Sequence, residues 1–163
     1  MNAHIECDSL ITAESKRLLM SSDQFDQRIL ELVNIERANV GLDSLSIDSQ
    51  LDQAANLHTD EMVQADQMSH QLPGEASLGD RVSATGYDWT RLGENVAAGY
   101  TTPEAVVAGW MNSTGHRENI LNPEFTHLGV GYENAPDNIT GTPENPDFDV
   151  YWTQVFGTDS FSS

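Results

Sequence analysis

Residues 110–122 read WMNSTGHRENILN, and they follow a segment that predicts a helix. Thr102 is a favourable N-cap and Pro103 is tolerated at the first helical position, so the helix is expected to begin there. The helix has an apolar face formed by Val106, Val107 and Trp110. Within the following polar run, His116 lies beside a glycine, a place where a side chain can reach a cleft.

Three more helices are expected before this segment. One runs from about Asp23 to Asn39, where apolar residues recur at helical spacing and Gly41 supplies the stop. A second carries an apolar stripe from Leu51 to Met62 and is opened by Asp48 or Ser49. The third is short, and its range is Ser77–Thr85 with Gly86 after it.

Three segments predict strands, because each is rich in β-branched or aromatic residues. They are Glu94–Ala98, Leu128–Tyr132 and Val150–Phe156. The last two are candidates for a hairpin. Residues 133–149 contain three prolines and several carboxylates, so they predict an exposed loop.

The length of 163 residues indicates one domain with a real core. We expect a leader or linker over residues 1–22, the domain over 23–158 and a tail over 159–163. Cys7 is the only cysteine, which excludes an intramolecular disulfide framework.

The charge balance is strongly acidic, with 26 Asp and Glu against 7 Lys and Arg and a formal net charge of -19. Such a surface repels phosphate backbones and anionic headgroups, so nucleic acid is excluded as the expected partner. No apolar run approaches the ~20 residues that a membrane span needs, and residues 1–22 lack a signal-peptide apolar region.

Common catalytic signatures are absent from the sequence: there is no Gly-x-Ser-x-Gly elbow, phosphate-binding glycine loop or His-Glu-x-x-His helix. Five other strings occur in order instead. They are Met68-Ser69-His70, Gly93-Glu94-Asn95-Val96-Ala97, residues 110–122, Leu128-Gly129-Val130-Gly131 and Tyr151-Trp152-Thr153-Gln154. Together they resemble the bacterial SCP-like domains of the CAP superfamily over about residues 24–157.

The resemblance implies an α/β fold, a three-layer α/β/α sandwich with a small, mainly antiparallel sheet. It also implies a secreted protein with a central cleft, whose residues fall here on His70, Glu94 and His116. Many eukaryotic members carry a glutamate three residues after the helix tryptophan, where this chain has Ser113. A catalytic mechanism that requires two cleft glutamates would therefore lack one of them in this chain.

Two imidazoles and one carboxylate can supply three ligands to Zn²⁺ or a similar divalent cation and leave one position for water. The alternative is that His70 and His116 only hydrogen-bond to Glu94 and hold helices to the sheet. A weaker Ca²⁺ candidate lies in the long loop, at Asp137, Glu144, Asp147 and Asp149, where hard oxygen ligands gather without EF-hand spacing.

Other polar and aromatic residues are expected to be structural. His58 lies in an apolar helical stripe and is expected to be a hydrogen-bonded core histidine. His127 precedes a strand and is expected at the surface or at an edge. Asn34 and Arg37 are expected to tie the first helix to a neighbouring loop. Trp110 and Trp152 are expected in the core.

Three functions remain open for such a domain, because fold does not fix function. The first is an extracellular binding module whose cleft holds a divalent cation and an unidentified ligand, peptide or lipid. The second is a metal-dependent hydrolase that uses the same cleft, although the sequence identifies neither a base nor an oxyanion partner. The third is a lipid-binding carrier.

Overall fold

The computed structural model describes residues 22–135 and 148–161 of the chain. Residues 1–21 of the expected leader lie outside these residues, as do three of the four Ca²⁺ candidates, Asp137, Glu144 and Asp147. The elements are α2 (Ser22–Asn39), β1 (Ser46–Ile47), α3 (Ser49–Ala65), α4 (Leu78–Ala84), β2 (Trp89–Ala98), α5 (Pro103–Met111), α6 (Thr114–Ile120), β3 (His127–Asn134) and β4 (Val150–Asp159).

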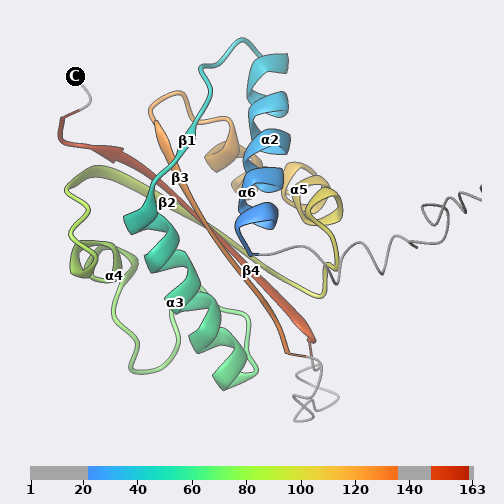
Figure 1. Cartoon of the computed structure of the whole chain (residues 1–163), viewed down its shortest axis with the longest axis vertical. Coiled ribbons are helices and arrows are strands. Elements are labelled where there is room, and N and C mark those ends of the chain that lie inside the picture. The colour runs from blue at the N-terminus through green and yellow to red at the C-terminus, as the bar shows by residue number, and fades with distance from the viewer. Residues whose placement is uncertain (1–21, 136–147, 162–163) are drawn as a thin grey trace, which may run out of the picture.

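The described strands form one sheet in the order β1-β3-β4-β2. Strand β4 runs antiparallel to both β2 and β3, and the short β1 pairs parallel with β3. The expected hairpin of the last two strands is therefore confirmed. Helices α2, α5 and α6 lie on one side of the sheet and α3 and α4 on the other (Figure 1). This is the expected α/β/α sandwich.

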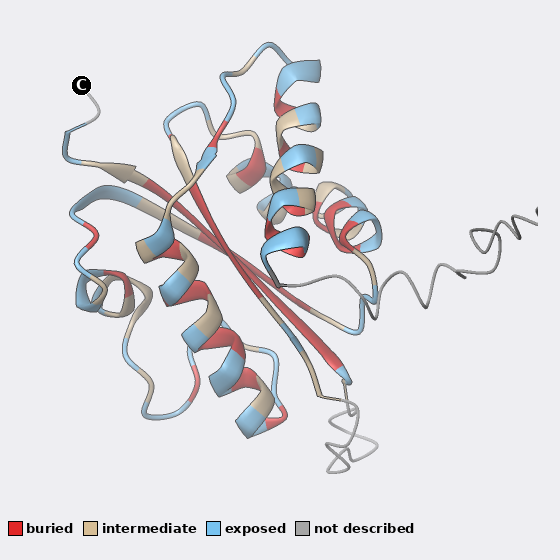
Figure 2. Ribbon diagram, in the orientation of Figure 1, coloured by how far each residue is buried: buried red, intermediate tan, exposed pale blue. Residues whose placement is uncertain are grey.

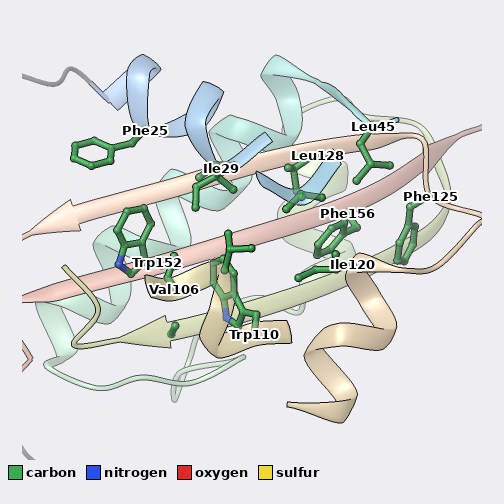
Figure 3. Close-up of a cluster of buried hydrophobic side chains, with 14 of the residues drawn as sticks. Phe25, Ile29, Leu45, Val106, Trp110, Ile120, Phe125, Leu128, Trp152 and Phe156 are labelled. Carbon is green, nitrogen blue, oxygen red and sulfur yellow. The ribbon is translucent and has the colours of Figure 1, made fainter. Parts of the chain in front are cut away.

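Strand β4 is buried along most of its length, on both faces of the sheet (Figure 2). Because successive strand residues point to opposite faces, Trp152 and Phe156 pack with α2, α5 and α6, whereas Tyr151 and Val155 pack toward α3 and α4. Trp110 and Trp152 are both in the larger of these cores, as expected (Figure 3).

The helices expected from periodicity are confirmed with their caps. Asp48 is the N-cap of α3, and its side chain accepts hydrogen bonds from the first-turn N–H groups of Gln50 and Leu51. Ser77 caps α4 and Thr102 caps α5. Helix α6 and strand β1 were not expected from the sequence, because one lacks an apolar stripe and the other has only two residues.

Arg37 ties α2 to distant loops, as predicted, although it is almost fully buried. Its guanidinium donates to the carbonyl oxygens of Asp43, Ile120 and Asn122 at 2.8–2.9 Å. Asn34 exchanges two hydrogen bonds with the backbone of Leu45. These contacts hold the start of the sheet and the end of α6 against α2.

Side chains from the helices bond to the backbone of β3 beyond its short pairing with β1, and to the backbone of the outer strand β2. On β3, the N–H of Val130 donates to Asp52 Oδ1 at 2.8 Å, and its carbonyl accepts from Asn56 Nδ2 at 3.3 Å. On β2, the carbonyls of residues 94 and 96 accept from Asn119 and Trp110. Side chains from the helices therefore satisfy backbone groups that an edge strand leaves open.

The glycines of β3 set the distance between the sheet and α3. A Cβ atom at Gly129 would overlap the backbone of Leu51, and one at Gly131 would overlap the carbonyl of Ala55. Backbone atoms cannot rotate away, so α3 would have to move.

We expect Gly129→Ala to lower the free energy of unfolding by about 2–4 kcal/mol, because it forces α3 off the sheet. Urea denaturation measures this change. The matched control is Gly115→Ala in α6, where an added Cβ meets nothing within 4 Å and a helical alanine is favoured by roughly 0.5–1 kcal/mol. Equal effects of the two substitutions would contradict the steric explanation.

Asp26, on α2, is a buried carboxyl group close to the carboxylates of Asp52 and Asp23. Burial, followed by these two charges, raises the pKa of Asp26 to about 7. Burial likewise raises the pKa of Asp52 to about 6. In the unfolded chain the two carboxyl groups ionise near pH 4. Their contribution to the free energy of unfolding therefore falls as the pH rises from about 4 to about 7.

We therefore expect Asp26→Asn to stabilise the protein by about 2 kcal/mol at pH 8 and to have little effect near pH 4. Urea denaturation at the two pH values measures the difference. Asp88→Asn, at an exposed position, is the control and should be neutral at both. A gain for Asp26→Asn that is equal at both pH values would show that burial of its charge is not the cause.

Candidate functional site

The candidate site wraps around the outer edge of β2, where the two helical layers meet. Glu94, on β2, points to the same side as Val96, toward α3 and α4, whereas Asn95 points to the α6 side. The segment between α3 and α4 brings His70 to Glu94, and α6 brings His116 from the opposite layer. The three predicted residues thus come from three different parts of the chain.

Glu94 is buried, and each of its carboxylate oxygens has a partner. Oε1 lies 3.0 Å from His70 Nδ1, and Oε2 lies 3.0 Å from the Nη1 atom of Arg81. Arg81 also donates from Nη2 to the carbonyl of His70 at 2.9 Å. One arginine therefore binds the carboxylate and the backbone of the histidine beside it.

Behind this group lies a second pair, His58 and Glu75. His58 is fully buried in α3; its Nδ1 lies 2.5 Å from Glu75 Oε1, and its Nε2 lies 2.8 Å from the carbonyl of Ser69. The prediction of a hydrogen-bonded core histidine is confirmed. Glu75 and Arg81 were not singled out from the sequence; the one available signal for Arg81 is that basic residues are scarce, with 7 Lys and Arg in the chain.

Two motif asparagines hold α6 against β2. Asn95 donates from Nδ2 to the carbonyl of His116 at 3.2 Å, and Asn119 donates to Asn95 Oδ1 at 2.9 Å. Asn95 also donates to Gln154 Oε1 on β4. These amides position the helix turn that carries His116.

The His116 ring lines a cavity of about 280 Å³. The wall is mostly apolar, and its larger side chains are Met68, Val96, Tyr100 and Trp110. Met68 and Tyr100 are also exposed, which places them at the mouth. Among the residues described, no hydrogen bond joins the His116 ring to Glu94 or His70. The arrangement offers an apolar cavity with an imidazole in its wall.

The two cleft histidines have opposite pKa shifts. The hydrogen bond to Glu94 raises the pKa of His70, and partial burial opposes this effect. Burial lowers the pKa of His116, and the charge of nearby His70 lowers it further. His116 is therefore the imidazole that stays neutral to lower pH.

A three-ligand metal centre is not preassembled in this structure. Within residues 22–135 and 148–161, no three His, Cys, Asp or Glu side chains are grouped so that they could hold a metal ion. Of the Ca²⁺ candidates, only Asp149 is described, and it is exposed just before β4. His127, predicted at the surface or an edge, is half-buried and bonds through Nδ1 to the hydroxyl of Tyr87 at 2.8 Å.

The fold and site define an α/β/α sandwich with a histidine–glutamate pair at an edge strand. A family model described as the cysteine-rich secretory protein family, CAP, matches residues 30–156. The chain belongs to this family.

Two curated relatives come from Bacillus subtilis (strain 168). The uncharacterized protein YkwD is 44% identical over 112 residues, which cover 69% of this chain and 44% of that protein. The uncharacterized membrane protein YlbC is 38% identical over 108 residues, which cover 66% of this chain and 31% of that protein. The chain thus spans less than half the length of either relative.

Solved structures agree with the fold. An extracellular protein with an SCP domain from Bacillus anthracis str. Ames is 32% identical, with a TM-score of 0.70, covering 86% of this chain and 44% of that one. An outer surface protein from Borrelia burgdorferi has the same TM-score at 19% identity, covering 86% of this chain and 97% of that one. The latter likeness shows the fold alone.

We expect the pKa of His70 to exceed that of His116, and Glu94→Gln to lower the pKa of His70. The substitution removes the charged acceptor and leaves the cation of Arg81 nearby. An NMR titration of the ring protons measures both values. Glu124→Gln is the control, since the Glu124 carboxylate pairs with exposed Arg91, away from His70. An unchanged His70 pKa in Glu94→Gln would refute the assigned cause.

Proposed function

We propose that this chain is an extracellular binding domain whose cleft accommodates a small ligand with an apolar part, beside a divalent cation. The observation that carries the proposal is the apolar cavity of about 280 Å³ with His116 in its wall, together with the nearby His70, which pairs with Glu94. Secretion is supported by the extracellular relative from Bacillus anthracis. None of the helices within residues 22–135 and 148–161 has the length and apolar character that a bilayer crossing requires.

Whether a side chain fits as a ligand of the divalent cation depends on whether it has a ligand atom that is not already engaged. Both oxygens of Glu94 are engaged, one by His70 and one by the cation of Arg81, so Glu94 does not fit as a direct ligand. The imidazoles of His70 and His116 do fit, because neutral imidazole nitrogen is a common zinc ligand. When bound, the cation would supply a Lewis acid to an oxygen atom of the ligand.

In this assignment Glu94 acts on His70 rather than on the metal. Its carboxylate accepts a hydrogen bond from one ring nitrogen, which leaves the other nitrogen free to bind. The His70 side chain is 60% exposed, so that nitrogen is accessible. His116 supplies the second imidazole from the opposite layer.

Binding has more support than hydrolysis in this arrangement. A hydrolase also needs a positioned general base, and the carboxylate at the site is held between a histidine and an arginine. The apolar cavity wall favours the carrier of a small apolar molecule as the second candidate, since pockets for such ligands are mainly apolar. The two candidate functions make different predictions: ligand binding by the cation-dependent domain requires His70 and His116, whereas binding of an apolar molecule by a carrier does not.

Isothermal titration calorimetry of metal-stripped protein with Zn²⁺ tests the proposal. We expect micromolar or tighter binding by the wild type and its loss in the double variant His70→Ala/His116→Ala. His127→Ala is the matched control, because it removes a histidine bonded to Tyr87 instead of a cleft residue.

No Zn²⁺ heat from the wild type, or equal heat from all three proteins, would overturn the proposed cation site. A Ca²⁺ titration of the same proteins completes the test. Ca²⁺ binding that persists in the double variant would place a cation site on carboxylates elsewhere, contrary to the proposal.

A further inference from the structure

The segment between α3 and α4, residues 66–77, carries Met68, which lines the cavity, and His70, which pairs with Glu94. It contains no helix or strand, so side chains from its neighbours must fix its path. His58 from α3 binds the carbonyl of Ser69, and Arg81 from α4 binds the carbonyl of His70. The two backbone anchors are therefore adjacent residues, one of them the cleft histidine itself.

Glu75 links these anchors from within the segment. Its Oε1 accepts from His58, its Oε2 accepts from the N–H of Leu72 at 2.8 Å, and Arg81 Nε lies 3.5 Å from Oε1. Leu72 is buried against α3 and the sheet. The Glu75 carboxylate thus holds residues 72 and 75 of the segment together and joins the segment to α3 and α4.

Both ring nitrogens of His58 face acceptor atoms. These are Oε1 of Glu75 and the carbonyl oxygen of Ser69, and a carboxylate and a carbonyl can only accept. His58 also lies close to the cleft carboxylate, since its Nε2 is 4.0 Å from Glu94 Oε1. His58 and Arg81 therefore contact both Glu75 and Glu94, and the four side chains form one connected buried group.

The same reasoning specifies His70. Glu94 accepts from Nδ1 of His70, so the proton of the neutral ring is on Nδ1 and the lone pair is on Nε2. This is the reverse of the tautomer that predominates in free histidine. The exposed Nε2 can then bind a cation or accept a hydrogen bond from a ligand.

We propose that His58, Glu75 and Arg81 are positioning residues that hold His70 against Glu94 and so keep the Nε2 lone pair of the exposed His70 ring free for a ligand. This deepens the proposed function, because that lone pair is what a cation or a donor group of the ligand meets. It assigns a role to His58, a residue that the helical pattern marks only as core.

The test reads the His70 tautomer in the metal-free full chain by ¹⁵N NMR of labelled histidine at a pH where the ring is neutral. We expect the Nδ1–H form in the wild type and a shift to mainly Nε2–H in His58→Phe, with hydrogen exchange of the amides of residues 67–76 at least tenfold faster. Glu75→Gln is the second variant, in case His58→Phe does not fold. His127→Phe is the control and should change neither reading.

An unchanged tautomer in both variants would overturn the proposal, even if the variants are less stable. A merely structural role would lower the free energy of unfolding and leave the tautomer as it is. Because no metal is present, the result is independent of the Zn²⁺ titration. Absence of Zn²⁺ binding by the wild type would overturn the proposed function and leave the positioning result standing.

Discussion

The burial of β4 on both faces is the constraint on which the rest of the structure depends. A strand that is apolar on both sides needs a helical layer on each side, and the paired cores around Trp152 and Tyr151 meet that need. Side chains from the helical layers on opposite faces of the sheet can then meet only at an edge of the sheet. The cleft lies at such an edge, beside β2, with Glu94 reached from one layer and His116 from the other.

Buried charges specify the site more than they stabilise the protein. A buried ion pair gains little over a well-packed apolar core, but removal of one partner costs on the order of 3–5 kcal/mol. Glu94, Arg81, Glu75 and His58 form such a group in a chain without a disulfide framework. The network therefore favours one arrangement of the segment that carries His70, since other arrangements leave a charge unpaired.

Sequence patterns predicted the main helices and the pairing of β3 with β4, because apolar periodicity records burial directly, whereas the α/β/α architecture was implied by the family resemblance. They also indicated His70, Glu94 and His116, through the family resemblance. They did not indicate that Arg81 and Glu75 join this group, since a polar residue on a short helix or loop carries no periodic signal. Helix α6 was missed for a related reason: Asn119 is fixed by an amide hydrogen bond, and only Ile120 of this helix is buried.

The side chains bonded to the backbone of β3 and β2 limit how this domain can associate. Asp52 and Asn56 occupy the backbone groups of Val130, and Asn119 and Trp110 occupy carbonyls of β2. A strand from another molecule would have to displace these side chains before it could pair at those positions. Strand addition is thus disfavoured at Val130 on β3 and at residues 94 and 96 on β2, so a peptide that docks beside these positions is recognised there through its side chains more readily than as an added strand.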